Sequence, residues 1–305
     1  MDIIGDIHGH ADELTVLLEK MGYYRGDTGT YQYPDNKRKV VFVGDLIDRG
    51  PKIRETLMLV KSMVDNGTAY CIRGNHEDNA IKFWTLAASK DNQDNSKDSA
   101  KEDKQEGYLR KHTIKNIIQH SATIKAFQNR ESEWERYIEW FKTLPYFLDF
   151  KDFRVVHASW HCALNSPAFD IKNDKQVQGI ILHGEELKLP VGSSFADKDG
   201  NVRVSGRTQW WLNPKGLTYR QYLEVYAMDI DGLDILIPDE ILQKLGSGYP
   251  ADAKPVFFGH YWLKGLPKVQ ASNVCCLDYS VAKGGNLVCY RFDGEKNLCN
   301  SKFVY

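Results

Sequence analysis

Three short apolar runs near the start of the chain each end in a glycine and a group of polar or charged side chains. They read "DIIGDIHG", "VVFVGDLIDRG" and "TAYCIRGNHE", and a helical pattern of apolar residues follows each of them. Strands that alternate with helices are typical of a mainly parallel sheet covered on both faces. In such sheets, ligands bind at the carboxyl ends of the strands. The sequence therefore predicts an α/β fold with a polar site at one edge of a sheet.

Two later apolar runs also end in a polar residue. "FRVV" is followed by His157, and "VFFG" is followed by His260. Alternating segments near "NVCCLDY" and "NLVCYRF" predict further strands, which we expect to be antiparallel. The region 170–206 is rich in loop-forming residues and receives no assigned element.

The chain changes character between these two groups of strands. Residues Lys90–Gly107 contain no large apolar side chain, which is typical of a solvated or disordered excursion. From Thr113 to Phe141 the pattern is again helical. We expect an insert over about residues 89–145 that covers one edge of the core, within a single domain that spans residues 1–305. A chain of 305 residues is long enough to bury a sizeable core.

Composition narrows the classes of partner. The chain has 40 basic and 41 acidic residues, so its net charge of −1 provides no general attraction to nucleic acid or to an anionic membrane. No apolar run approaches the roughly 18 residues of a membrane span, and the apolar stretch at the start is too short for a secretory signal. Six cysteines without paired C-x-x-C spacing predict reduced thiols rather than a zinc knuckle. The expected location is the cytoplasm.

The polar residues at the strand ends are of the types that bind divalent transition metals, namely carboxylates, imidazoles and one amide. Asp6 and His8 lie two residues apart on an extended segment, so they project to the same side. Asp45 has two oxygens and can bridge two cations. Two cations about 3.5–4 Å apart can clamp the attacking and the leaving oxygen of a phosphoryl transfer. Each motif alone also fits a turn, a helix start or a hydrogen-bonded core histidine, but five in succession favour one shared site.

In this order, "GDIHG", "GDLIDRG", "RGNHE", a lone histidine after a strand and "FGH" resemble the motifs of the calcineurin-like metallophosphoesterases. More narrowly, they resemble the phosphoprotein phosphatase branch, which includes bacterial symmetrical diadenosine tetraphosphatases and serine/threonine phosphatases. The resemblance spans nearly the whole chain. It implies a central β-sandwich flanked by helices and a metal-dependent hydrolase. Two divalent metal ions are implied, with manganese expected first and iron, zinc, nickel or cobalt as alternatives.

The resemblance also implies the metal ligands, which are Asp6, His8, Asp45, Asn75, His157 and His260. One metal would be held by Asp6, His8 and Asp45. The second would be held by Asp45, Asn75 and the two later histidines, so that Asp45 bridges the pair. A hydroxide between the metals would be the nucleophile. Asn75 would also contact the substrate.

Further residues would act on the substrate. His76 would be the general acid that protonates the leaving oxygen, and Asp48 would orient it. Arg49 would hold phosphoryl oxygens, because a planar guanidinium suits phosphate. The family usually supplies a second arginine, for which Arg207 in "SGRTQWW" is the first candidate and Arg203 the alternative.

The expected substrate is a dinucleoside polyphosphate or a related nucleotide, with a phosphoprotein as the alternative. Glu77 leaves the phosphoprotein open, since tetraphosphatases usually have aspartate at this position. A nuclease is disfavoured by the near-neutral charge and because Trp262 stands where nucleases of this family have a second histidine. A catalytically inactive metal-binding scaffold is disfavoured because His76, Asp48 and Arg49 are all present.

The remaining aromatic and histidine residues receive secondary expectations. Trp210, Trp211, Tyr261 and Trp262 can stack on a nucleobase, although a place in the core is the commoner outcome for such residues. His10 and His161 are expected to face solvent or to lie behind the ligands. The histidines expected at the surface are His112, His120 and His183.

Overall fold

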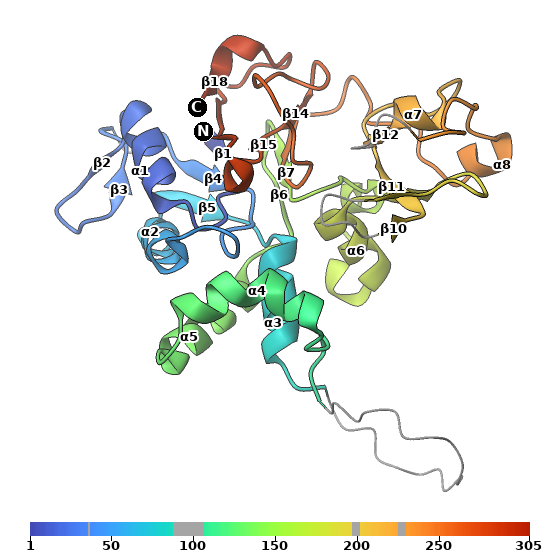
Figure 1. The fold of residues 1–305 in the computed structure, drawn as a ribbon. Coiled ribbons are helices and arrows are strands. Elements are labelled where there is room, and N and C mark those ends of the chain that lie inside the picture. Colours follow the sequence, from blue (N-terminus) through green and yellow to red (C-terminus); the bar gives the residue numbers. More distant parts are fainter. Residues whose placement is uncertain (36, 88–106, 197–201, 225–229) are drawn as a thin grey trace, which may run out of the picture.

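Two sheets packed face to face form the centre of the protein (Figure 1). The computed structural model describes residues 1–305 except 36, 88–106, 197–201 and 225–229. The predicted polar excursion therefore lies, apart from Gly107, outside the described residues. The first sheet has the order β18 (Phe303–Val304), β17 (Cys289–Arg291), β1 (Asp2–Ile4), β4 (Val40–Phe42) and β5 (Ala69–Cys71). The second has the order β14 (Val274–Cys276), β13 (Val256–Phe258), β7 (Arg154–Val156) and β6 (Phe147–Asp149).

Each of the two sheets combines parallel and antiparallel strand pairs. In the first sheet β1, β4 and β5 are parallel, and β17 and β18 are antiparallel. In the second sheet β7, β13 and β14 are parallel, and β6 is antiparallel. The prediction that the segment "NVCCLDY" forms an antiparallel strand was therefore wrong for β14. The prediction was correct for β15 (Asp278–Tyr279) in the same segment, which pairs antiparallel with β16 (Asn286–Leu287), and for β17 in the segment "NLVCYRF".

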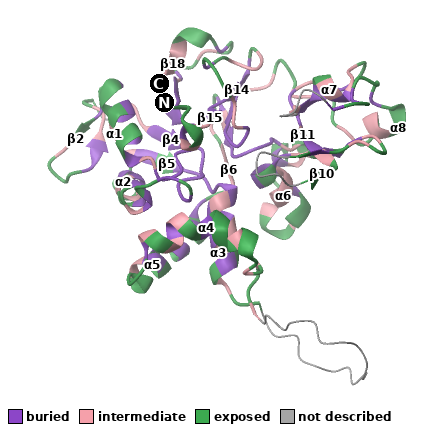
Figure 2. Cartoon of the chain, in the orientation of Figure 1, coloured by how far each residue is buried: buried purple, intermediate pink, exposed green. Residues whose placement is uncertain are grey.

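Side chains that alternate along the strands fill three layers of core. Ile3 and Val41 of the first sheet meet Val155 and Phe257 of the second between the sheets. On its other face, the first sheet packs Phe42 against the helices α1 (Ala11–Lys20) and α2 (Ile53–Asp65). The outer face of the second sheet packs against the helix α6 (Lys175–His183) and two buried tryptophans. This is the predicted β-sandwich flanked by helices, and Figure 2 shows its buried centre.

Helix α6 lies in the region to which the sequence assigned no element. Its start carries an N-cap, because the Asp174 side chain accepts hydrogen bonds from the backbone N–H groups of Gln176 and Val177. The remaining elements are α3 (Asn75–Trp84), α7 (Tyr219–Tyr222), α8 (Asp239–Leu242), β2 (Tyr24–Arg25), β3 (Tyr31–Gln32), β8 (Glu186–Lys188), β9 (Phe195–Ala196), β10 (Val202–Arg203), β11 (Ser205–Thr208), β12 (Leu223–Glu224), β15 (Asp278–Tyr279), β16 (Asn286–Leu287) and short 3-10 turns. Among the described residues, no helix combines the length and the apolar character that crossing a bilayer requires.

The predicted helical insert contains two helices, α4 (Ile114–Ala126) and α5 (Glu131–Thr143). α5 buries an apolar stripe at helical spacing, made of Trp134, Tyr137, Ile138, Trp140 and Phe141. The guanidinium of Arg73, just after β5, donates to the carbonyls of Phe141 and Lys142 at the end of α5. The insert is thereby fixed to the end of β5, an edge strand of the first sheet.

Candidate active site

The loops after β1, β4, β5, β7 and β13 converge at one edge of the sandwich. They bring together the side chains that the sequence predicted as metal ligands. Each of these residues exposes less than a tenth of its surface: Asp6, His8, Asp45, Asn75, His157 and His260. Buried charged and polar groups need partners or a bound ion.

These loops hold their functional residues in a backbone conformation that L-residues rarely adopt. Eight non-glycine residues of the described chain have a positive φ angle. Only Asn129 and Ser280 lie outside the loops of the site; the others are His8, Asp45, Asp48, Arg49, His260 and Trp262. Such strain costs about 1–3 kcal/mol per residue and persists only where the surroundings fix it. Its concentration here favours a functional role for these loops.

Two glycines allow the loops to approach closely. Gly44 has φ +92°, and a Cβ atom on it would lie 2.4 Å from the backbone nitrogen of Gly74 in the "RGNHE" motif. A Cβ atom on Gly259 would lie 1.9 Å from Oδ1 of Asp6. Any side chain at either position would push the motifs apart.

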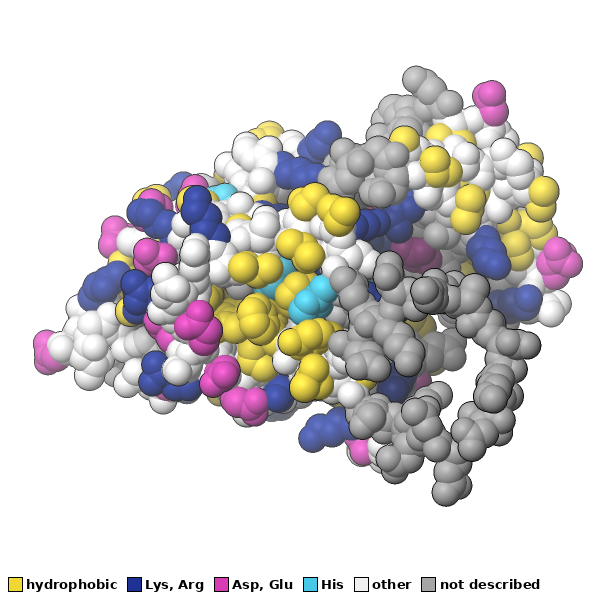
Figure 3. All heavy atoms as spheres, turned by 60° about the horizontal axis from the view of Figure 1, so that its bottom comes forward, with side chains coloured by type: hydrophobic (Ala, Val, Ile, Leu, Met, Phe, Trp, Pro, Cys, Tyr) yellow, Lys and Arg dark blue, Asp and Glu magenta, His cyan; other side chains and the backbone are white. Residues whose placement is uncertain are grey.

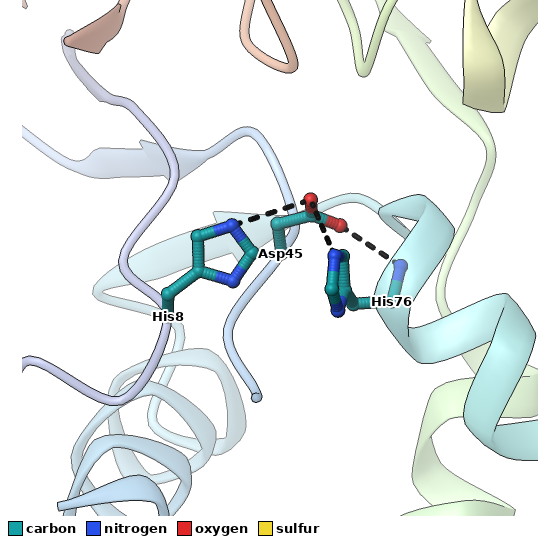
Figure 4. A group of neighbouring side chains, drawn as sticks. All are labelled: His8, Asp45 and His76. Atoms are coloured by element: carbon teal, nitrogen blue, oxygen red, sulfur yellow. Dashed lines mark hydrogen bonds and ion pairs between the residues drawn. The ribbon is translucent and has the colours of Figure 1, made fainter. Parts of the chain in front are cut away.

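Asp45 lies at the centre, with its two carboxylate oxygens turned to different neighbours. Oδ2 is 3.7 Å from Nε2 of His8 and 3.9 Å from Nε2 of His76 (Figure 4). Oδ1 is 3.4 Å from Nε2 of His157 and accepts a hydrogen bond from the backbone N–H of His76. Burial would raise the pKa of Asp45, but the charges of His157 and His76 outweigh burial and hold it well below its usual value. The carboxylate is therefore ionised and can serve two cations.

The three candidate histidine ligands each have one ring nitrogen on a backbone carbonyl. His8 Nδ1 bonds to Ile47 O at 2.8 Å, His157 Nδ1 to Val43 O at 2.8 Å, and His260 Nε2 to His183 O at 3.1 Å. The ring N–H donates to the carbonyl, which leaves the lone pair of the other nitrogen for the site. This arrangement is common for histidines that bind metals.

Several buried atoms lack the partner that a cation would provide. Oδ1 of Asp6 and Nε2 of His8 have no hydrogen bond partner. Burial, with the nearby charges of Asp278 and Asp45, raises the pKa of Asp6 well above its usual value. Burial and the neighbouring His76 lower the pKa of His8 to about 3. A neutral imidazole and carboxylates crowded together fit divalent cations.

Ligand atoms within 4.8 Å of one another form two groups among the described residues. The first is His8, Asp45 and His76, and the second is Asp45, His157 and His260. Asp45 belongs to both groups. Asp6 lies in neither group, although its Oδ2 accepts a hydrogen bond from the backbone N–H of His260. Asn75 adds an amide oxygen 2.9 Å from Nε2 of His157.

His76 and Asp48 form a close pair at the edge of the candidate ligands. His76 Nδ1 lies 2.5 Å from Asp48 Oδ2, so its Nε2 faces Asp45. Burial would raise the pKa of Asp48, but hydrogen bonds from His120 and His76 hold it well below its usual value. Burial would lower the pKa of His76, yet the charge of Asp45 and the hydrogen bond to Asp48 raise it. The pair is therefore poised to hold a proton on His76.

The surface position predicted for His120 was wrong. His120 is 1% exposed, and its Nδ1 lies 2.8 Å from Oδ1 of Asp48. His112 is half-buried and stacks on Phe83 at 3.8 Å, so it is not a surface residue either. His183 is exposed, and His10 is half-buried on backbone carbonyls of its own loop.

The arginines predicted to bind phosphate lie on two sides of the site. Arg49 is exposed, with its guanidinium carbon 4.0 Å from the centre of the Trp262 ring. The ammonium nitrogen of Lys283 lies 4.3 Å from the same ring centre. Arg207 donates to the carbonyl of His260 at 2.7 Å, whereas Arg203 lies exposed on β10. The geometry therefore favours Arg207 over Arg203.

Three of the four aromatic residues considered for base stacking belong to the core. Trp210 and Trp211 are each 7% exposed, and Tyr261 is fully buried. They pack on Phe258 behind the site. Trp262 alone lies beside the substrate residues, with two cationic side chains over its ring.

The prediction from the sequence did not include Asp278, which holds a loop of the site. This buried carboxylate accepts hydrogen bonds from the backbone N–H groups of Trp262 and Ser280. It thus fixes the loop that carries Trp262 close to Asp6. The segment "LDYSVAKGG" contains it, but no spacing rule pointed to it.

Glu77 fixes the backbone of the central motif. Its carboxylate accepts hydrogen bonds from the N–H groups of Asp45 and Leu46, both at 2.8 Å, and of Gly74 at 2.9 Å. The side chain is fully buried and faces the protein interior rather than a substrate. The choice of glutamate here therefore gives no support to a phosphoprotein substrate.

Replacing Glu77 by glutamine should lower the free energy of unfolding by about 2–4 kcal/mol, because an amide N–H would face a buried backbone donor. Glu139→Gln is the matched control, since Glu139 is exposed and its carboxylate accepts a hydrogen bond from Lys142 at the surface. Urea unfolding of both variants measures the difference. Equal stability of Glu77→Gln and the wild type would contradict the structural role.

Comparison with known proteins places the chain beside phosphohydrolases. The family model for calcineurin-like phosphoesterases matches residues 2–260. Bis(5'-nucleosyl)-tetraphosphatase PrpE, asymmetrical, of Oceanobacillus iheyensis is 32% identical over 61% of this chain and 64% of its own length. The protein of that name from Halalkalibacterium halodurans is 53% identical over 25% of this chain and 30% of its own length. A serine/threonine phosphatase structure from Saccharomyces cerevisiae shares 14% identity over 99% of this chain and 77% of that one, with a TM-score of 0.46.

This chain thus spans less than two thirds of the length of the curated relatives that it matches. Both relatives have the word asymmetrical in their names, whereas the resemblance drawn from the motifs was to symmetrical enzymes.

Proposed function

Since the chain belongs to the calcineurin-like phosphoesterase family and is therefore a phosphohydrolase, we propose that it uses two divalent metal ions to cleave dinucleoside polyphosphates or related nucleotides. The observation that carries this proposal is the position of Asp45, which has one oxygen toward His8 and the other toward His157. A shared carboxylate between two ligand groups suits a pair of cations. Manganese is the metal we expect first.

The residues of the site would have separate roles in metal binding, proton donation and phosphate binding. Asp6, His8 and Asp45 would hold one ion, and Asp45, Asn75, His157 and His260 the other. When bound, the ions neutralise phosphoryl oxygens and acidify a water molecule. His76 gives the proton on its Nε2 to the leaving oxygen, since its Nδ1 is held by Asp48. Arg49 holds the phosphoryl oxygens and orients the substrate.

The substrate class rests on two observations. The curated relatives are named as tetraphosphatases of bis-nucleosyl compounds. Arg49 and Lys283 both lie over Trp262, and Arg207 lies by His260, so several cationic groups border the site. A chain of phosphates carries more negative charge than a single phosphoserine and gains more from several cations.

A single domain over residues 1–305 and a cytoplasmic location stay predictions from the sequence.

Removing divalent ions with a chelator should abolish hydrolysis, and manganese should restore it. A panel of diadenosine tetraphosphate, a phosphomonoester, a phosphodiester and a phosphopeptide then tests the substrate class. We expect the highest kcat/KM for diadenosine tetraphosphate. A higher value for the phosphopeptide would replace the nucleotide by a phosphoprotein. Hydrolysis of the diester without the monoester would contradict the proposal and favour a nuclease.

A further inference from the structure

The helical insert brings a buried imidazole to the carboxylate behind the proton donor. His120 of α4 points its Nδ1 at Oδ1 of Asp48, 2.8 Å away, and is 1% exposed. One turn later, Thr123 donates its hydroxyl to the same oxygen at 2.6 Å. Residues three apart lie on the same face of a helix, so α4 presents both groups together.

The same helix also fixes the backbone of Asp48. The hydroxyl oxygen of Thr123 accepts a hydrogen bond from the Asp48 N–H at 3.1 Å. Asp48 has a φ of 67°, in the left-handed region that is uncommon for residues other than glycine, although aspartate is among the residues enriched there. With Oδ1 occupied by His120 and Thr123, Oδ2 is the oxygen left for His76, at 2.5 Å. The direction of the His76 ring therefore depends on contacts made by α4.

A third contact decides which nitrogen of His120 carries its proton. The indole Nε1 of Trp84 donates to Nε2 of His120 at 3.2 Å. An indole N–H is only a donor, so Nε2 must accept and carries no proton. The proton of the neutral ring then lies on Nδ1, where it is donated to Asp48. Trp84 thus donates to His120, His120 donates to Oδ1 of Asp48, and His76 donates to the other oxygen of the carboxylate.

We propose that His120 is a positioning residue for proton donation: as a neutral ring with its proton on Nδ1, it holds Asp48 in the orientation that aims His76 at the leaving oxygen. This inference rests on the proposed function, because it assigns His76 as the proton donor. It adds that the insert, rather than the five motif loops alone, completes the catalytic arrangement. The role is one of orientation, since the hydrogen bonds of His120 in the described structure go to Asp48 and Trp84 and its ring packs on Phe83 and Trp134.

Packing of α4 on the core does not explain why its contact with Asp48 is made by polar side chains. The buried residues of α4 are His120 and Thr123, while its isoleucines Ile114, Ile117 and Ile118 are exposed. Figure 3 turns the bottom of Figure 1, where the helices of the insert lie, toward the reader. Hydrophobic side chains gather on this face. A helix that only covered the core would bury its isoleucines. The orientation of α4 instead delivers two hydrogen bond donors to Asp48.

The test compares His120→Leu and His120→Asn, with His112→Leu as the matched control in the same insert. His112 stacks on Phe83 and Tyr108 but contacts no residue of the site. We expect His120→Leu to lower kcat for phenyl phosphate by about 10- to 100-fold with unchanged KM, as for other residues that orient a functional side chain. For p-nitrophenyl phosphate, whose leaving group needs less protonation, the loss should be small. His120→Asn retains an N–H at the position of Nδ1 and should restore most of the activity.

A second measurement needs no turnover. In the metal-free protein labelled with ¹⁵N, the ring of His120 should appear as the neutral form with its proton on Nδ1, assigned by its absence from the His120→Asn spectrum. A proton on Nε2, or on both nitrogens, would overturn the proposal. So would equal losses on the two phosphate esters, or failure of His120→Asn to restore activity. Failure of the wild type to hydrolyse either ester with manganese would instead count against the proposed function.

Discussion

Replacing Asp45 by asparagine should remove both metal ions and reduce kcat by more than about 1,000-fold, because the preorganised charge of the site supplies most of the stabilisation of a phosphoryl transition state. Asparagine keeps the shape of the side chain and one acceptor oxygen for the backbone N–H of His76. It removes the negative charge and the second oxygen. Both candidate ligand groups contain Asp45, so both should weaken together.

Single histidine changes provide the comparison for this prediction. His8→Ala and His157→Ala each alter one ligand group and leave the other unchanged. We expect each to retain about one ion per chain where Asp45→Asn retains none. Asp65→Asn is the control for a lost carboxylate, since Asp65 is exposed on α2 and pairs with Lys61. Metal analysis by mass spectrometry after gel filtration measures the content. Two ions per chain in Asp45→Asn would refute the shared role.

The sequence predicted which side chains come together at the candidate site, because they lie directly after strands. Each motif combines an apolar run, a glycine and a polar group within about ten residues, which local patterns can detect. The order of the runs and the parallel direction of β1, β4 and β5 then bring the motifs to one edge. Pairing between distant segments has no such local signal. β14 was therefore assigned the wrong direction, since no local pattern shows that it pairs in parallel with β13.

His120 shows why the rest of the site escaped prediction. On α4, Ile114, Ile117 and Ile118 are exposed whereas His120 and Thr123 are the buried residues, so the hydrophobic pattern assigns the helix the wrong face. The observation that reveals His120 is its hydrogen bond to Asp48, a residue more than seventy positions earlier in the chain. Asp278 escaped for a related reason, because its partners are backbone N–H groups, which a sequence does not display. Contacts of this kind follow from tertiary packing and not from periodicity.

Replacing His76 by glutamine should leave the metal content unchanged and lower kcat by about 100- to 10,000-fold on substrates with poor leaving groups. Glutamine is similar in reach but cannot carry the transferable proton of an imidazolium. The short contact with Asp48 and the raised pKa of His76, due to Asp45 and Asp48 acting against burial, both favour the protonated ring. For the same reason, kcat of the wild type should fall as pH rises through the pKa of His76, because the acid form is then lost.

The position of His76 leaves one competing role, since its Nε2 lies within the first ligand group beside His8 and Asp45. Metal content separates the two roles, because a ligand that is removed weakens its ion whereas a lost proton donor does not. Loss of one ion from His76→Gln would make His76 a ligand. Unchanged turnover of phenyl phosphate would contradict the proton transfer. If the metal content is unchanged and kcat falls only for esters with poor leaving groups, both ring nitrogens of His76 have a role. Nδ1–H donates to Asp48, and the proton on Nε2 goes to the departing oxygen.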